Sequence, residues 1–497
     1  MAQEMKRLAK ETAIYGMSSI VGRFLNWLLV PLYTFVLEGS SDYGIVTNIY
    51  AWVALLLVLL IYGMETGFFR FANKEGVDGE KVYGNTLWCI GFTSLLFAVV
   101  CLLCSGGIAN ALGYPSHRDI ISMMVVVVAL DAYDSIVFAY LRYRRQSVKF
   151  ALLKLFSIFI SIAFNLFFFL GCPWLLRHYP DLISWFYDAD YGVGYVFVSN
   201  VISTGLVTLA LLPDMKIILR PDFGLLKQML RYSLPLLVLG VAGIMNQTLD
   251  KIIFPFLFTD KELASSELGI YGACFKVAMV MMMFTQAFRY AYEPFIFSKH
   301  KDRNSVGAYA DAMKYFVIFS LLILLGMLFY LDLIKLIIHP SYWAGMRVVP
   351  IVLFSYVFQG VFFNLSLWYK LTDRTYYGAC FSLLGLVITV VLNIVLVPRI
   401  SYMGSAWASF ACYLVMMLVS YFVGQRYMKI PYDLRSMGLY LLVTLVLLGL
   451  SQLLHTETAW LNYLVNTVLL GVYLLLMINR DFPLHGLPVV GKYFKKR

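Results

Sequence analysis

The chain has 497 residues, of which 61% are hydrophobic and only 13% charged, and its mean hydropathy is +0.78. A water-soluble globular chain has about 45–50% apolar and about 25% charged residues, because even a large core needs a polar surface. This composition therefore excludes a soluble enzyme and indicates that membrane lipid surrounds most of the chain. The formal net charge of +11 does not indicate a nucleic-acid partner, since the basic residues lie between apolar segments and at the chain ends.

Fourteen apolar segments are long enough to cross a bilayer, which requires about 20 mainly apolar residues. The sequence therefore predicts an all-α polytopic membrane protein with 14 transmembrane helices. The first segment is too long for the apolar part of a cleavable signal peptide, so we expect it to remain as a span. The predicted spans lie near 12–37, 43–65, 82–105, 119–141, 150–171, 191–212, 228–258, 269–292, 311–331, 347–369, 377–397, 403–424, 437–454 and 460–479.

The connections between these spans alternate in their content of basic residues. With the N-terminus inside, every inner connection carries at least two Lys or Arg residues, and no outer connection carries more than two. Cytoplasmic connections of membrane proteins are enriched in Lys and Arg. A missing or additional span would invert the alternation after the error. We therefore expect fourteen spans with both termini cytoplasmic.

The connections offer little for catalysis or for a cofactor. The longest outer connection, Cys172–Asp190, carries several aromatic side chains and is expected to lie in the outer membrane interface. No connection is long enough for a soluble catalytic domain, and the sequence has no G-x-x-x-x-G-K phosphate loop. The 6 histidines do not pair at metal-ligand spacing. We expect neither a cofactor nor a metal.

The sequence contains an internal repeat. Residues 40–45 (SSDYGI) open the second predicted span, and residues 265–270 (SSELGI) open the eighth. Each copy begins inside and holds six spans. Because this number is even, the copies are expected to be parallel repeats, as in transporters that rock two lobes about a central site. The predicted domains are an N-terminal six-helix lobe (1–213), a C-terminal six-helix lobe (214–426), and two additional helices with a basic cytoplasmic tail (427–497).

Two parts of the chain resemble a known family. Residues 37–44 resemble the first-loop signature of polysaccharide and O-antigen exporters, and residues 248–253 with 268–273 resemble the seventh and eighth spans of that family. The chain is identified as a member of the multidrug/oligosaccharidyl-lipid/polysaccharide exporter superfamily. It is most similar to the bacterial Wzx-type flippase branch.

The resemblance implies a transporter of the bacterial inner membrane, not an enzyme. Such proteins move undecaprenyl-diphosphate-linked oligosaccharides, such as O-antigen or capsule repeat units, from the cytoplasmic to the periplasmic leaflet. Polysaccharide polymerases or ligases then use these substrates and are possible partners. The resemblance also implies two lobes around a cationic, V-shaped cavity that opens alternately to each side.

A diphosphate head group that crosses hydrocarbon needs fixed positive charge along its path. Arg23 lies near the middle of the first predicted span, where a charge is costly and usually faces a cavity or a partner. It is expected either to anchor the diphosphate or to form an ion pair with Asp131, and both interpretations stay open. Lys251 and Lys276 are the other candidate substrate-binding residues. Lys276 is expected to meet the diphosphate or to pair with Asp250.

Three acidic residues are candidates for ion coupling or ion pairing. Asp131 and Asp134 lie one helical turn apart and therefore share a face. They are expected either to bind a coupling cation, Na⁺ or H⁺, or to neutralise Arg23. Asp250 directly precedes Lys251. Because adjacent residues on a helix do not face each other, we expect these two to contact different neighbours.

Three other functions compete with this prediction. A cation-coupled multidrug antiporter of the same superfamily would favour an acidic cavity, which the basic candidates argue against and the paired aspartates favour. A lipid II flippase would differ only in the head group of its substrate. An oligosaccharide polymerase or ligase usually carries a long periplasmic loop, which this sequence does not have.

Overall fold

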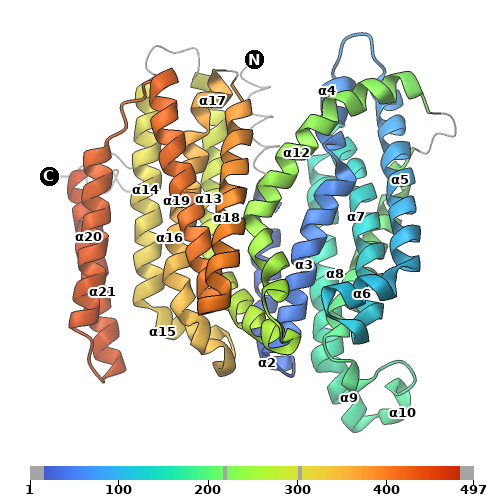
Figure 1. Ribbon diagram of the computed structural model, residues 1–497, viewed down its shortest axis with the longest axis horizontal. Coiled ribbons are helices and arrows are strands. Elements are labelled where there is room, and N and C mark those ends of the chain that lie inside the picture. Colours follow the sequence, from blue (N-terminus) through green and yellow to red (C-terminus); the bar gives the residue numbers. More distant parts are fainter. Residues whose placement is uncertain (1–15, 19, 217–220, 300–304, 373, 482–497) are drawn as a thin grey trace. The chain divides into compact units, whose positions relative to one another are not determined.

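The structure is a computed structural model that describes residues 16–18, 20–216, 221–299, 305–372 and 374–481. All regular secondary structure within these ranges is helical, which confirms the predicted all-α class (Figure 1). The basic residues expected at the two chain ends lie mostly outside these ranges.

Fourteen helical segments of the described chain are long and apolar enough to cross a membrane, which confirms the predicted number. The chain is a multi-pass membrane protein. The first span covers Gly16–Val36 and ends in α2 (Leu29–Val36). The principal helices of the other spans are α3 (Ser40–Ile61), α5 (Gly79–Leu103), α7 (Arg118–Tyr143), α8 (Ser147–Leu166), α11 (Gly194–Leu211), α12 (Phe223–Ile253), α13 (Lys261–Lys299), α14 (Ser305–Phe329), α16 (Val348–Leu365), α18 (Tyr376–Ile400), α19 (Tyr402–Tyr427), α20 (Leu434–Leu453) and α21 (Ala459–Arg480).

Shorter helices extend or connect these spans. The second span continues after a left-handed turn at Tyr62 and Gly63, whose φ angles are 33° and 73°. The connection predicted to lie in the outer interface forms two short helices, α9 and α10. The shorter helices are α4 (Met64–Ala72), α6 (Ser105–Leu112), α9 (Cys172–His178), α10 (Pro180–Ile183), α15 (Leu331–Ile334) and α17 (Leu367–Leu371).

The described chain forms two compact units. The first runs to Lys276 and includes Ala379–Cys412, and the second comprises Val277–Gly378 and continues from Tyr413. The six-helix lobes expected from the repeat stay a prediction.

In the first unit, α7 packs against α3, α5, α8 and α11, and the long α12 lies along α3. At one end of this unit the rings of Tyr83 and Tyr140 stack with their centroids 3.9 Å apart. Tyr83, Phe68 and Val137 are buried together there. This packing fixes α7, which carries two of the candidate acidic residues.

In the second unit, α14 packs against α16, α20 and α21. The hydroxyl of Tyr473 on α21 donates to the carbonyl oxygen of Ile318 on α14, at 2.9 Å. Nζ of Lys314 lies 3.0 Å from a carboxylate oxygen of Asp481, at the end of α21. The last two helices are therefore tied to α14 by apolar and polar contacts.

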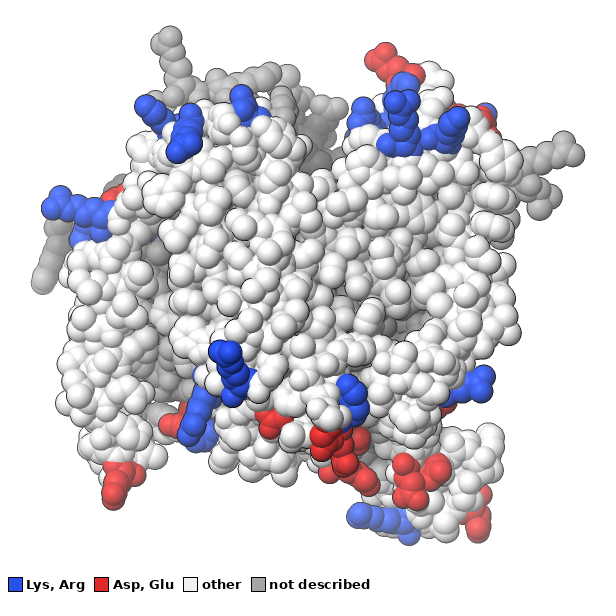
Figure 2. Space-filling model, viewed as in Figure 1, with Lys and Arg blue, Asp and Glu red and all other residues white. Residues whose placement is uncertain are grey.

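On the face shown in Figure 2, charged side chains gather toward the ends of the spans and leave the band between them largely uncharged. In the first unit, Lys and Arg gather at the end that carries α4, whereas Asp and Glu are frequent at the end that carries α9 and α10. Such a distribution is typical of a protein whose middle lies in hydrocarbon.

Candidate functional site

The two copies of the repeated sequence lie against each other in the first unit. A Cβ atom at Gly44 of α3 would come within 1.8 Å of the carbonyl oxygen of Ser265 in α13. The contact is reciprocal, because a Cβ atom at Gly269 would come within 1.8 Å of the carbonyl oxygen of Ser40. The hydroxyls of Ser40 and Ser266 are 2.6 Å apart. Only glycine permits such a close approach of two backbones, so the repeated sequence marks a contact between α3 and α13.

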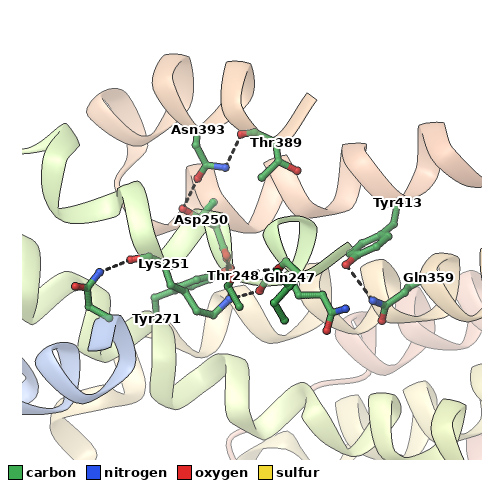
Figure 3. Close-up of polar contacts among 12 residues, drawn as sticks. Gln247, Thr248, Asp250, Lys251, Tyr271, Gln359, Thr389, Asn393 and Tyr413 are labelled. Carbon is green, nitrogen blue, oxygen red and sulfur yellow. Dashed lines mark hydrogen bonds and ion pairs between the residues drawn. The ribbon is translucent and has the colours of Figure 1, made fainter. Parts of the chain in front are cut away.

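Asp250 and Lys251 form a buried ion pair near the end of α12 (Figure 3). Their exposed fractions are 3% and 8%, and Nζ of Lys251 lies 2.9 Å from Oδ2 of Asp250. The expectation that these two residues contact different neighbours is wrong, because the long lysine side chain folds back onto the adjacent carboxylate. Tyr271 of α13 donates a further hydrogen bond to Asp250, at 2.7 Å. The pair is neutralised within itself.

Other contacts hold this ion pair in the first unit. Nζ of Lys251 lies 3.8 Å from the centre of the Phe275 ring. The amide of Asn48 on α3 donates to the carbonyl oxygen of Lys251, at 2.7 Å, and Asn246 on α12 donates to the carbonyl oxygen of Ser382 on α18, at 2.9 Å. The end of α12 is thus bonded to helices on two sides. As a substrate-binding residue, Lys251 stays a prediction.

Arg23 and Lys276 lie in spans without an acidic partner among the described residues. Arg23 is exposed and Lys276 half-buried. The indole N–H of Trp27 donates to the carbonyl oxygen of Lys276, at 2.9 Å, and so places the first span beside α13. Arg23 and Trp27 are four residues apart and share a helix face. The two cations are thereby carried by neighbouring parts of adjacent helices. No ion pair joins Arg23 to Asp131 in the described chain.

Asp131 and Asp134 face α11 from the middle of α7. The hydroxyl of Thr204 lies 3.4 Å from Oδ1 of Asp131, and that of Thr208 lies 2.7 Å from Oδ2 of Asp134. Lys154 of α8 acts electrostatically on both carboxyl groups, although no ion pair within 4.0 Å joins them in the described residues. The threonines were not expected from the sequence, because nothing in the pattern of α11 indicates which of its residues face α7.

A small pocket in the second unit was also not predicted from the sequence. It brings together Arg289 from α13, Asn364 from α16 and Lys370 from α17. No motif marks this pocket, because its basic residues belong to separate spans. In the sequence, Arg289 falls within the predicted span 269–292 and Lys370 follows the predicted span 347–369, so nothing in their positions indicated that they meet.

The fold occurs in solved structures of other proteins. It is similar to that of the lipid II flippase MurJ in an inward closed conformation, with a TM-score of 0.72, 14% identity, and coverage of 94% of this chain and 98% of the other. It is also similar to an inward-facing multidrug resistance MATE family transporter of the MOP superfamily (TM-score 0.63, 10% identity, 82% and 95% coverage). The MATE multidrug transporter DinF-BH has a TM-score of 0.57 (16% identity, 84% and 95% coverage). These identities establish the fold alone.

The chain belongs to the polysaccharide biosynthesis protein family, whose pattern it matches over residues 8–300. No curated protein matches the chain. The predicted resemblance to the exporter superfamily is confirmed by this family and by the shared fold.

Proposed function

We propose that the chain is a flippase that moves an undecaprenyl-diphosphate-linked oligosaccharide, an O-antigen or capsule repeat unit, across the bacterial inner membrane. Transport runs from the cytoplasmic to the periplasmic leaflet by alternating access, and both termini are cytoplasmic. The polysaccharide biosynthesis family and the flippase-like fold support this proposal. The chain is a transporter and not an enzyme.

The observation that carries the proposal is the presence of two cations, Arg23 and Lys276, on helices joined by the Trp27 hydrogen bond and without acidic partners in the described chain. A charge within a membrane span is costly and is usually paired or faces a polar path. A diphosphate supplies two anionic groups that form charge-assisted hydrogen bonds with such side chains. Arg23 and Lys276 are therefore assigned to the diphosphate, while the polyprenyl chain stays in lipid.

Lys251 has a conditional role in this proposal. Its ammonium already contacts the carboxylate of Asp250, so it reaches the diphosphate only in a state in which this ion pair opens. The proposal also includes a coupling cation, Na⁺ or H⁺, which would act at acidic groups of the spans. A polymerase or ligase on the periplasmic side would consume the product and is the expected partner.

Two related functions are distinguished by the substrate. The solved structure with the TM-score of 0.72 is a lipid II flippase, and lipid II would present the same diphosphate to Arg23 and Lys276. The multidrug transporters of the same fold raise a second possibility, which the paired carboxyl groups of Asp131 and Asp134 favour, because acidic side chains attract cationic drugs.

Leaflet transfer in proteoliposomes tests the proposal. A fluorescent polyprenyl-diphosphate oligosaccharide is placed in both leaflets, and a membrane-impermeant quencher measures how much of it reaches the outer leaflet with time. The proposal expects rapid transfer with the protein and slow transfer in protein-free vesicles. Transfer of lipid II alone would assign the chain to the lipid II flippases. Uptake of cationic dyes without transfer of either lipid would contradict the proposal and support a multidrug antiporter.

A further inference from the structure

The carboxyl group of Asp134 lies deep in the first unit, and no cation of the described residues lies within ion-pair distance of it. Asp134 is 3% exposed and lies in the middle of α7. Its Oδ1 atom is buried and has no hydrogen-bond partner among the described residues. An ionised carboxylate accepts several hydrogen bonds, and leaving one buried without them costs far more than burying a neutral carboxyl. The unpartnered oxygen therefore favours the neutral form.

The hydroxyl of Thr208 gives an independent indication. It lies 3.0 Å from the carbonyl oxygen of Thr204, one turn earlier in α11, and 2.7 Å from Oδ2 of Asp134. A threonine hydroxyl has one hydrogen and two lone pairs. In a helix it commonly donates to the carbonyl oxygen four residues earlier. If Thr208 donates to Thr204, the short contact with Asp134 is a hydrogen bond only when Asp134 carries the proton and donates it.

The nearest cation does not provide the missing charge. Nζ of Lys154 lies 3.9 Å from the centre of the Phe138 ring, and not within ion-pair distance of either aspartate. Phe138 belongs to the same helix as Asp131 and Asp134. The ammonium therefore rests on an aromatic face close to the carboxyl pair, from which a change in side-chain conformation would bring it to the carboxylates.

The other groups around the pair are few. The carboxyl groups of Asp134 and Asp131 act electrostatically on the neighbouring hydroxyls of Tyr133 on α7 and Tyr50 on α3, respectively. On α11, the groups that face the two aspartates are the hydroxyls of Thr204 and Thr208. On α5, Gly91 lies against the ring of Tyr133. The ion pair of Glu65 on α4 with Arg142 on α7 acts on Lys154 and is neutral as a whole.

The geometry points to Asp134 as a proton-binding site of the transport cycle. In the conformation described, Asp134 carries a proton and Lys154 rests on Phe138. When the proton leaves Oδ2 of Asp134 for water, the ammonium of Lys154 moves from the Phe138 ring to the new carboxylate. The role of this proton in transport rests on the proposed function, because its binding and release would couple the movement of the lobes to the proton gradient.

Infrared difference spectroscopy tests the protonation without any substrate. The full chain is measured in a detergent that has no ester carbonyl, at neutral and at alkaline pH. A protonated carboxyl group absorbs as a C=O stretch that is lost on ionisation. We expect such a band at neutral pH in the wild type and in Asp131→Asn, and its loss in Asp134→Asn. A neutral-pH spectrum without the band, or a band that persists in Asp134→Asn, would overturn the inference.

Two further variants keep the test decisive if Asp134→Asn does not fold. Thr208→Val removes the acceptor of the proposed hydrogen bond, and the band should move to the frequency of a free carboxyl. Lys154→Met removes the cation that replaces the proton, and the band should persist to higher pH than in the wild type. No change in either variant would contradict the assignment. If the wild type binds Na⁺ and Asp134→Asn does not, the site binds a metal ion instead of a proton, and the inference is overturned.

The role in transport is measured separately in proteoliposomes. An inward proton gradient should accelerate leaflet transfer of the polyprenyl-diphosphate oligosaccharide by the wild type and leave the rate of Asp134→Asn unchanged. Equal acceleration of both would overturn the coupling role while the infrared result stands. If no lipid is transferred at all, the proposed function fails, and the infrared band still decides whether Asp134 binds a proton.

Discussion

At the scale of single residues, the spans carry charges in two different settings. Asp250 and Lys251 neutralise each other in a buried pair, whereas Arg23 and Lys276 have no acidic partner among the described residues. Removing one member of a buried pair leaves an uncompensated charge, but removing both does not. The two settings therefore predict different results for substitution.

Asp250→Asn and Lys251→Met should each destabilise the protein by about 3–5 kcal/mol, because each leaves one buried charge unpaired. The double variant should recover most of this loss. Thermal unfolding in detergent, followed by tryptophan fluorescence, measures the effect. Losses that simply add in the double variant would show that the two side chains do not act as a pair.

The candidate residues could be named from the sequence because charges in apolar segments are conspicuous, but their partners could not. The sequence places Asp131 and Asp134 on one apolar segment and Lys154 on the next, and only the packing of α7 against α8 and α11 brings them together. The fold-back of Lys251 onto Asp250 was not foreseen, because spacing along a helix describes where Cβ atoms point and not how a four-carbon side chain bends.

At the scale of helices, two features make specific demands on the sequence. The contact between α3 and α13 requires glycine at Gly44 and Gly269, and α12 begins at a capping residue, Asp222. The repeated sequence predicted that α3 and α13 hold corresponding places in two copies of one topology. It did not predict that the two copies touch, since a repeat carries no information on which faces meet.

Gly44→Ala should destabilise the protein by about 1–3 kcal/mol, because the new methyl group would overlap the carbonyl oxygen of Ser265. Gly243→Ala in α12 is the matched control. Apart from the adjacent backbone of α12 itself, no described atom lies within 4 Å of the position of its Cβ, so alanine should be neutral or stabilising there. Unfolding midpoints of both variants in detergent test the contact. Equal effects at the two positions would argue against a close approach of α3 and α13.

Asp222 should stabilise α12 in a pH-dependent manner. Its carboxylate accepts a hydrogen bond from Lys81 at 2.8 Å and one from the backbone N–H of Leu225 at 3.1 Å, and these bonds hold the pKa of Asp222 below its usual value. A carboxyl whose pKa is lowered by folding stabilises the protein above the pKa of the unfolded chain, about 3.9, and loses this effect as the pH falls through the folded-state value.

Asp222→Ala should therefore lower the unfolding midpoint at neutral pH, and the difference from the wild type should vanish in acid. Unfolding measured from neutral to strongly acidic pH gives the two curves. A constant difference across this range would mean that the carboxylate charge does not support the helix.

At the scale of the whole molecule, the sequence predicted the class, the number of spans and the superfamily, and these are confirmed. Apolar segments of sufficient length and alternating basic connections are direct consequences of the bilayer, so they can be recognised without a structure. The division into compact units, the pocket at Arg289 and the threonines beside the aspartates depend on side-chain packing between distant segments. They could not be predicted from spacing along the chain.

We propose that Arg23 and Lys276 carry the diphosphate of a lipid-linked oligosaccharide across the membrane. The most direct test compares leaflet transfer by the wild type, Arg23→Gln, Lys276→Gln and Lys227→Gln, the last being an exposed lysine of α12 as a control. We expect the first two variants to lose about tenfold or more in rate, because a hydrogen bond to a charged group contributes about 1.5–3 kcal/mol. The control should transfer at the wild-type rate. Wild-type rates in both Arg23→Gln and Lys276→Gln would show that these two side chains do not bind the diphosphate.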